Sequence, residues 1–436
     1  MSYTAPRSAR SAPAAPATGR IIIASLIGTT VEFYDFYIYG TAAALVLGPV
    51  FFPSHVPQIE TLAAFLTFGI AFLARPVGAF LFGHFGDRFG RKSTLVASML
   101  VMGISTTLIG VLPGYATAGI LAPVLLCLMR LGQGIGLGGE WGGAALLATE
   151  NAPPGRRAWF GMFPQLGPSI GFLVSNGVFL ILFALLTDKQ FLAWGWRIPF
   201  LLSSVLVGIG LYVRGKLPET MAFQTALARA ERVRLPAREV IFSQGVPLLQ
   251  GALAIVVCYT LFYTSTVFAL GYGTRTRHIP RDTFLGMLCI GILGMAVATP
   301  IAAALADRFG RRAVLLAASA AAAVSGFLFA PLLGSGSVVG VQLFLILELA
   351  LMGFTFAPLG ALLPELFPTN LRYSGASAAY ALGGILGGSL APYIAQRLVV
   401  AGGLSWVGYY ITVAAVVSFI AIFSITETRG RGVMRL

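Results

Sequence analysis

The chain has 436 residues, of which 57% are hydrophobic and only 10% are charged, and its mean hydropathy is +0.86. Soluble domains usually contain about 25% charged residues, so this composition excludes a set of soluble domains and indicates a polytopic membrane protein. A net charge of +14 could suit a nucleic acid partner. In a membrane protein, however, basic residues hold loops on the cytoplasmic side, and no nucleic acid partner is expected.

Cysteine and histidine are rare and scattered. The residues are Cys127, Cys258, Cys289, His55, His84 and His278. The cysteines lie in apolar runs, where reduced packing residues are expected rather than disulfides. The histidines form no ligand pattern typical of zinc. We therefore expect neither a metal site nor a cofactor.

Twelve hydrophobic segments are long enough to cross a bilayer core, which takes about 20 helical residues. They cover residues 20–48, 59–85, 93–112, 117–149, 159–186, 194–213, 244–272, 281–305, 313–333, 338–366, 370–399 and 404–426. The predicted organisation is a disordered cytoplasmic tail at 1–19, a six-helix bundle at 20–213, a basic cytoplasmic loop at 214–243, a second six-helix bundle at 244–428 and a cytoplasmic tail at 429–436.

Basic residues predict the orientation of these segments. With the N-terminus inside, 21 of the 29 lysines and arginines fall in cytoplasmic segments and six in outer segments. The remaining two, Arg75 and Arg130, lie within spans. Because cytoplasmic loops are enriched in Lys and Arg, both termini and the central loop are expected in the cytoplasm.

The two halves of the chain repeat each other. Residues 86–92 (GDRFGRK) recur at 306–312 (ADRFGRR), an offset of 220. Glu150, Pro153 and Arg157 recur at an offset of 215 as Glu365, Pro368 and Arg372. Two parallel repeats of six helices predict a binding site between them, near the bilayer midplane.

The first loop motif resembles that of the major facilitator superfamily. Its residues are Gly83, Asp87, Arg88, Gly90, Arg91 and Lys92, and the second copy departs from the motif only in having Ala303 where the first has Gly83. Further runs resemble the metabolite:proton symporter family within that superfamily. They are VEFYDFYIYG at 31–40, FLARP at 72–76, RLGQG at 130–134, GGEWGG at 138–143, GWRIPF at 195–200 and RYSGAS at 372–377.

This resemblance covers residues 20–428 and implies both a fold and an activity. The fold is all-α, with twelve transmembrane helices in two pseudo-symmetric bundles. The activity is proton-driven uptake of a small metabolite, such as a dicarboxylate, tricarboxylate, shikimate, proline or betaine, across a bacterial inner membrane. The resemblance implies a carrier that functions as a monomer and is not an enzyme; its partners are the small substrate, protons and the lipid bilayer.

Placing a charged side chain at the centre of a membrane span costs about 2.5–3.5 kcal/mol of insertion free energy. We therefore interpret the ionisable residues within spans as functional. They are Glu32, Asp35, Arg75, Arg130, Glu140 and Glu348. Proton-coupled sugar carriers of the superfamily have a similar first-span Asp and fourth-span Arg. Asp35 and Arg130 are therefore expected to pair, so that movement of the arginine changes the proton affinity of the carboxyl. The alternative is a permanent structural pair. Glu32 and Glu140 are further candidates for proton coupling.

Arg75 and Arg130 together could neutralise a substrate carboxylate. Alternatively, Arg75 is a structural cation beside Pro76, bonded to carbonyls that the proline frees. Other candidate substrate contacts share a polar or aromatic side chain within a span. They are Tyr39, Gln133, Tyr259, Tyr263, Gln342, Glu348 and Tyr380. Aromatic residues on membrane helices more often serve packing. A packing role for these tyrosines is therefore the alternative.

The loop motifs imply a cytoplasmic gate. The resemblance assigns it Gly83, Asp87, Arg88, Gly90, Arg91, Lys92, Glu150, Arg157, Asp307, Arg308, Arg311, Glu365 and Arg372. Topology signals alone would account for the basic residues but not for Asp87 or the glycines.

The leading hypothesis is a symporter of a proton and a small organic acid: a mono-, di- or tricarboxylate, or a shikimate-like acid. A symporter of a zwitterion such as proline or betaine is an alternative. An antiporter that exports hydrophobic compounds is another, because residues 167–171 (GPSIG) partly resemble the fifth-span motif of antiporters. No nucleophile–base pattern or sensor domain supports an enzyme or a receptor.

Overall fold

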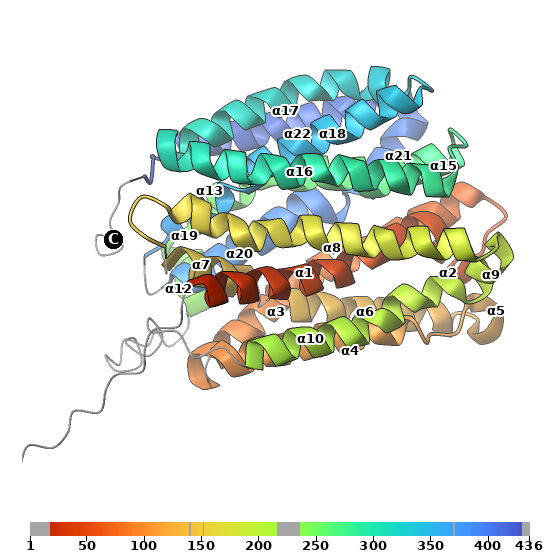
Figure 1. Ribbon diagram of the computed structural model, residues 1–436, viewed down its shortest axis with the longest axis horizontal. Helices are drawn as coiled ribbons and strands as arrows, with labels where there is room; N and C mark the ends of the chain where they lie inside the picture. Colours follow the sequence, from red (N-terminus) through yellow and green to blue (C-terminus); the bar gives the residue numbers. More distant parts are fainter. Residues whose placement is uncertain are drawn as a thin grey trace, which may run out of the picture.

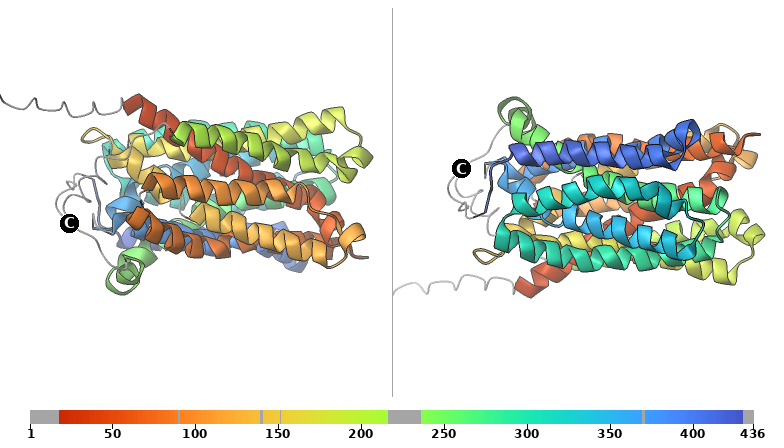
Figure 2. Two further views of the ribbon diagram at one scale, coloured as in Figure 1. Left: turned by 90° about the horizontal axis from the view of Figure 1, so that it is seen from below. Right: turned by 90° about the horizontal axis from the view of Figure 1, so that it is seen from above.

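The computed structural model describes residues 18–89, 91–138, 141–150, 152–215, 236–368 and 371–429. These residues form a bundle of helices that run side by side along the long axis of the molecule (Figures 1 and 2). Ten helical segments are long and apolar enough to cross a membrane. The predicted first and third spans are also helical, although they are not among those ten.

The first six predicted spans form the N-terminal half. Their helices are α1 (Thr18–Ala42) with η1 (Ala43–Leu47) and α2 (Gly48–Phe51), α3 (Pro57–Phe89), α4 (Arg91–Ile109), α6 (Leu121–Gly138) with α7 (Trp141–Glu150), α8 (Arg157–Leu185) and α10 (Ile198–Gly215). Two short helices, α5 (Tyr115–Ala118) and α9 (Asp188–Ala193), and the turn η2 (Gly195–Arg197) lie between them.

The last six spans form the C-terminal half. Their helices are α13 (Gly245–Ala254) with α14 (Val256–Tyr263), η3 (Thr264–Phe268) and α15 (Ala269–Arg275), α16 (Arg281–Phe309), α17 (Arg311–Leu333), α18 (Val338–Phe356) with α19 (Leu359–Glu365), α20 (Arg372–Gly384) with η4 (Ile385–Ser389) and α21 (Ala391–Gly402), and α22 (Leu404–Ser424). The helix α12 (Pro236–Ser243) precedes them. The π-helical turns η1 and η3 interrupt the first span of each half at matching points.

Glycines bring the helices that carry the site close together. A β-carbon at Gly134 of α6 would lie 2.1 Å from the carbonyl oxygen of Ala71 in α3, and one at Gly138 would lie 2.1 Å from the carbonyl oxygen of Arg75. Small residues that let backbones approach are typical of membrane helix interfaces. This packing holds the backbone of Arg75 directly against α6.

The two halves contact each other along their length. Helix α8 packs against α1 of its own half and against α16 of the other half, while α3 packs against α20 and η4. Large aliphatic and aromatic side chains remain exposed on the outside, including Leu128, Ile301 and Phe327. An apolar outer surface of this kind suits contact with lipid.

Candidate functional site

Arg75 lies at the interface between the halves in a cage of aromatic rings. Its side chain is 2% exposed, and its Nη1 donates to the hydroxyl of Tyr259 on α14 at 3.1 Å. Its guanidinium carbon lies 4.3 Å from the ring centre of Phe72 and 4.8 Å from that of Phe36. The expected alternative, bonding to carbonyls freed by Pro76, is not what the structure shows. Arg75 has no acidic partner among the described residues.

Tyrosines of the C-terminal half complete this cage. Tyr259 and Tyr263 are nearly parallel, with ring centres 6.0 Å apart, and the ring of Tyr380 lies 5.6 Å from that of Tyr259. Tyr380 stacks on Trp141 of α7, with ring centres 4.0 Å apart and planes 5° apart. The stack joins the two halves. Tyr259, Tyr263 and Tyr380 were predicted as candidate contacts from the sequence, whereas Trp141 was not.

A buried polar chain continues from Trp141 toward the C-terminal half. The indole Nε1 of Trp141 donates to Oε1 of Gln165 on α8 at 3.0 Å, and Nε2 of Gln165 donates to the carbonyl of Phe356 at 3.1 Å. Gln165 is fully buried. Gln165 cannot be predicted from sequence, since a lone amide on a membrane helix has no pattern that marks its partner.

Arg130 on α6 is held inside the N-terminal half. Its Nη2 donates to the carbonyl of Phe68 at 2.9 Å, its Nε to that of Thr67 at 3.4 Å, and its Nη1 to Oε1 of Gln133. The guanidinium also lies 3.7 Å from the ring centre of Tyr39, whose hydroxyl shares a hydrogen bond with Oγ1 of Thr67. Arg130 is therefore satisfied by neutral groups.

The expected ion pair between Asp35 and Arg130 is not present in the structure. Gln133 lies between them instead: it accepts from Arg130 and donates from Nε2 to the backbone carbonyl of Asp35 at 2.8 Å. The same Nε2 lies 2.9 Å from Oγ1 of Thr106. The amide of Gln133 therefore lies where the carboxylate of Asp35 was expected.

Both carboxyls of α1 are buried, at 1% exposure for Glu32 and 0% for Asp35. Glu32 lies within electrostatic range of Tyr37 and Tyr380, which places it toward the aromatic cage. Asp35 acts on Tyr34, whose hydroxyl donates to the carbonyl of Pro199 on α10. The third candidate for proton coupling, Glu140, lies outside the described residues.

The structure does not bring Gln342 and Glu348 to the cage. Gln342 is half-buried and donates to the carbonyl of Met287 on α16 at 3.2 Å. Glu348 is fully buried on α18 and faces Ser325 of α17. Both side chains therefore lie inside the C-terminal half, away from Arg75. At the repeat offset of 215 residues, Glu348 corresponds to Gln133, whose side chain contacts groups of the N-terminal half.

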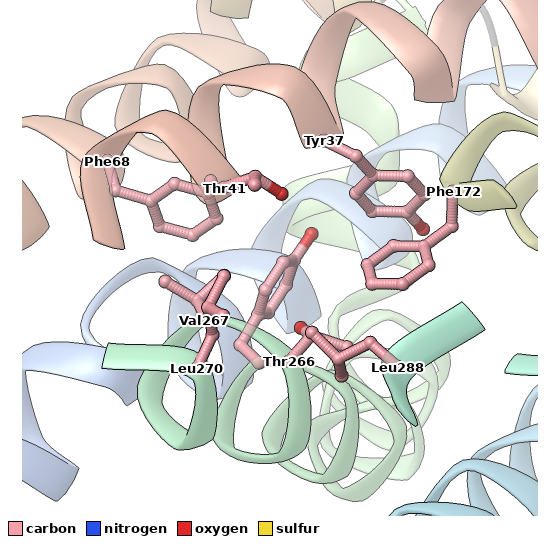
Figure 3. A pocket seen from close by; sticks show the side chains of 10 residues that line it. Tyr37, Thr41, Phe68, Phe172, Thr266, Val267, Leu270 and Leu288 are labelled. Atoms are coloured by element: carbon pink, nitrogen blue, oxygen red, sulfur yellow. The ribbon is translucent and has the colours of Figure 1, made fainter. Parts of the chain in front are cut away.

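A small pocket lies next to the cage between the two halves (Figure 3). Tyr37, Thr41 and Phe172 border it from the N-terminal half, and Thr266 and Leu288 from the C-terminal half. Tyr263 lines both pocket and cage, because its ring centre lies 5.5 Å from that of Phe72. The pocket presents aromatic faces and hydroxyls. Charged residues within spans, which mark candidate sites in a sequence, do not indicate a pocket with such a lining.

An ionic network joins the two halves at the end of the bundle where α16 meets α17. Glu365 Oε1 lies 3.3 Å from Arg311 Nη2 and 3.8 Å from Arg157 Nη1, which belongs to the other half. Asp307 accepts from the backbone nitrogens of Ala158 and Trp159 at the start of α8, at 3.0 and 2.9 Å. The carboxylate thus caps a helix of the opposite half.

Three other predicted gate residues lie near this network. Arg372 is bonded to the carbonyl of Phe367 at 3.4 Å and lies within electrostatic range of Glu150. Arg308 lies over the ring of Phe309. The first loop motif stays a prediction: Gly90 is outside the described residues, and so are the side chains of Asp87, Arg88, Arg91 and Lys92, while Gly83 is known only as a helical residue of α3.

The sequence and the fold are similar to those of known transporters. A family model described as "Sugar (and other) transporter" matches residues 21–248 and 238–436, nearly the whole chain. The chain belongs to this family, in the major facilitator superfamily. It is 52% identical to the inner membrane metabolite transport protein YhjE of Escherichia coli over 94% of both chains.

Other relatives place the chain among the metabolite:proton symporters. It is 40% identical to the shikimate transporter of E. coli, with 92% of both chains covered. It is 33% identical to the proline/betaine transporter of Salmonella typhimurium, over 94% of this chain and 84% of the relative. The proton:xylose symporter XylE of E. coli shares its fold, with a TM-score of 0.75 at 16% identity over 95% of this chain and 97% of XylE. The protein is a multi-pass inner-membrane transporter of small metabolites.

Proposed function

We propose that this transporter takes up a small organic acid together with protons by alternating access. Arg75 carries the proposal. A buried guanidinium is costly at membrane depth, and the described residues around Arg75 supply a hydroxyl and aromatic faces but no acid. An incoming carboxylate would supply the missing negative charge through charge-assisted hydrogen bonds.

The proposed route of the substrate follows from the contacts between the halves. The ionic network of Asp307, Arg311 and Glu365 closes the end that we place in the cytoplasm, together with both termini. At the other end, Asp188 and Arg281 form an exposed pair across the halves at 3.5 Å. Opening these two ends in turn would expose Arg75 first to the outside and then to the cytoplasm.

We assign proton coupling to Asp35, with Glu32 as the competing residue. Both carboxyls are buried on α1, the helix that packs against α8 at the contact between the halves. Glu32 is supported by its position toward the cage, and Asp35 by its backbone link through Gln133 to Arg130. Movement of α1 relative to α6 would change the surroundings of either group.

A zwitterionic substrate such as proline or betaine is a second candidate. The rings of Tyr37, Phe172 and Phe262 cluster beside the pocket, with Tyr37 and Phe262 stacked at 4.9 Å. Aromatic faces of this kind bind quaternary ammonium groups, while Arg75 would bind the carboxylate of the same molecule.

Arg75→Gln tests the proposal. A hydrogen bond to a charged group contributes about 1.5–3 kcal/mol, so we expect the affinity for an anionic substrate to fall roughly 10- to 140-fold. The measurement is uptake of labelled acids, proline and betaine into proteoliposomes under an imposed pH gradient. Arg397→Gln, at an exposed position on α21, is the matched control. Unchanged affinity with normal protein levels would make Arg75 a structural cation and favour an exporter of hydrophobic compounds.

A further inference from the structure

Glu348 is a buried carboxyl for which the proposed function has no role. It lies on α18 with no exposed surface, and among the described residues neither carboxyl oxygen has a hydrogen-bond partner. Helix α18 packs against α14, α16 and α17, and Figure 1 shows α16 and α17 beside it. Burying an ionised carboxylate without a partner costs far more than burying a neutral acid. The surroundings therefore favour the protonated form.

The helices that pack against α18 supply no charge to Glu348. The titratable residues on these helices are Cys258, Tyr259 and Tyr263 on α14, Arg281, Asp282, Cys289, Asp307 and Arg308 on α16, Arg311 and Arg312 on α17, and Glu365 on α19. None of them acts on Glu348, and the only side chain that does is Ser325 of α17. Among the described residues, no cation acts on this carboxyl.

The N-terminal half shows what the corresponding position does when it carries a neutral group. Gln133 precedes Glu348 by the repeat offset of 215 residues. Its amide Nε2 lies 2.9 Å from Oγ1 of Thr106, which in turn donates to the carbonyl of Met102 at 2.9 Å. Because the hydroxyl proton of Thr106 is already used, Gln133 must be the donor of the bond between them.

Ser325 of α17 lies close to Glu348, as Thr106 lies close to Gln133, but no hydrogen bond joins the two side chains in this structure. The Oγ of Ser325 donates to the carbonyl of Ala322 at 2.9 Å, so its oxygen is left as an acceptor. A carboxylate cannot donate to that oxygen, whereas a carboxylic acid can, just as the amide of Gln133 does. A hydrogen bond between these two side chains would therefore need a proton on Glu348.

We propose that Glu348 is a proton-binding site in the C-terminal half, occupied in this closed conformation and separate from the carboxyls of α1. The proton would leave when α18 and α17 separate and water reaches the carboxyl. The proposal rests on the proposed function, because it adds a second site to proton-coupled uptake. Each additional coupled proton multiplies the achievable accumulation about tenfold per pH unit of gradient.

Glu348→Gln tests the proposal, because glutamine has the shape of the protonated acid and is the residue found at the matching position. We expect counterflow exchange within about twofold of the parent protein, and accumulation at least about tenfold lower under a gradient of one pH unit. We also expect the pH dependence of uptake to flatten. Glu239→Gln, a half-buried acid on α12, is the control. Accumulation and pH profile equal to the parent would overturn the proposal and leave Glu348 a structural donor.

A measurement on the unmodified protein covers the case in which the variant fails to fold. A hydrophobic carbodiimide reacts with protonated carboxyls in apolar surroundings, and mass spectrometry locates the adduct. We expect Glu348 to be modified, with the yield falling as the pH is raised. No adduct at Glu348 at any pH, while other buried acids react, would refute the proposal. A parent protein that accumulates nothing under a pH gradient would instead refute proton-coupled uptake, and the carbodiimide result would still report on Glu348.

Discussion

The contact of Asp307 with the start of α8 gives a direct test of how the transporter closes. Asp307→Asn keeps the size of the side chain but removes its charge. The carboxylate accepts from two backbone nitrogens of the opposite half, and its side chain is only 12% exposed. The amide retains a single acceptor oxygen, so one charge-assisted bond is lost, and with it about 1.5–3 kcal/mol.

This loss should shift the protein toward the form that is open at this end. The ratio of closed to open molecules is expected to fall roughly 10- to 140-fold. A cysteine in place of Ser377 reports the change, because Ser377 is buried on α20 and a β-carbon at Gly142 of α7 would lie 2.1 Å from its Oγ. In a background without Cys127, Cys258 and Cys289, the rate of maleimide labelling should rise by the same factor.

Asp282→Asn provides the matched control, since Asp282 is an exposed residue at the opposite end of the same helix α16. It should leave the labelling rate unchanged. If Asp307→Asn also labels at the parent rate with normal protein levels, the cap on α8 does not hold this end closed, and the gate must depend on Glu365 and its arginines alone.

Three further predictions concern topology, coupling and packing. A cysteine at position 230 should resist an impermeant reagent applied outside intact cells, and labelling there would contradict a cytoplasmic central loop. Asp35→Asn should retain counterflow but lose pH-driven accumulation; if it still accumulates substrate and Glu32→Gln does not, the coupling acid is Glu32. Gly134→Val should lower the amount of folded protein, because its β-carbon would lie 2.1 Å from the Ala71 carbonyl oxygen, whereas Gly177→Ala, with open space around it, should be neutral on thermal unfolding.

The twelve-helix fold could be predicted because hydrophobic length and the repeated loop motif act over many residues at once. The tyrosines around Arg75 could be identified as candidates, since they are polar side chains within spans. Their partners could not. Helical spacing places Asp35 and Arg130 on inward faces but cannot show that Gln133 lies between them. The hydrogen bond from Gln165 to a backbone carbonyl could not be predicted either, because every residue has a carbonyl and the sequence does not show which one accepts.

The hydrogen bond between Arg75 and Tyr259 would compete with the binding of the proposed substrate. In the closed form the tyrosine hydroxyl occupies a donor of the arginine that the proposed carboxylate would need. Part of the interaction with the substrate is then used to separate the two halves rather than to tighten binding. If Arg75 binds the substrate carboxylate as proposed, this one contact would both lower the affinity and speed release. A transporter without the hydroxyl of Tyr259 would then bind its substrate with higher affinity and release it more slowly.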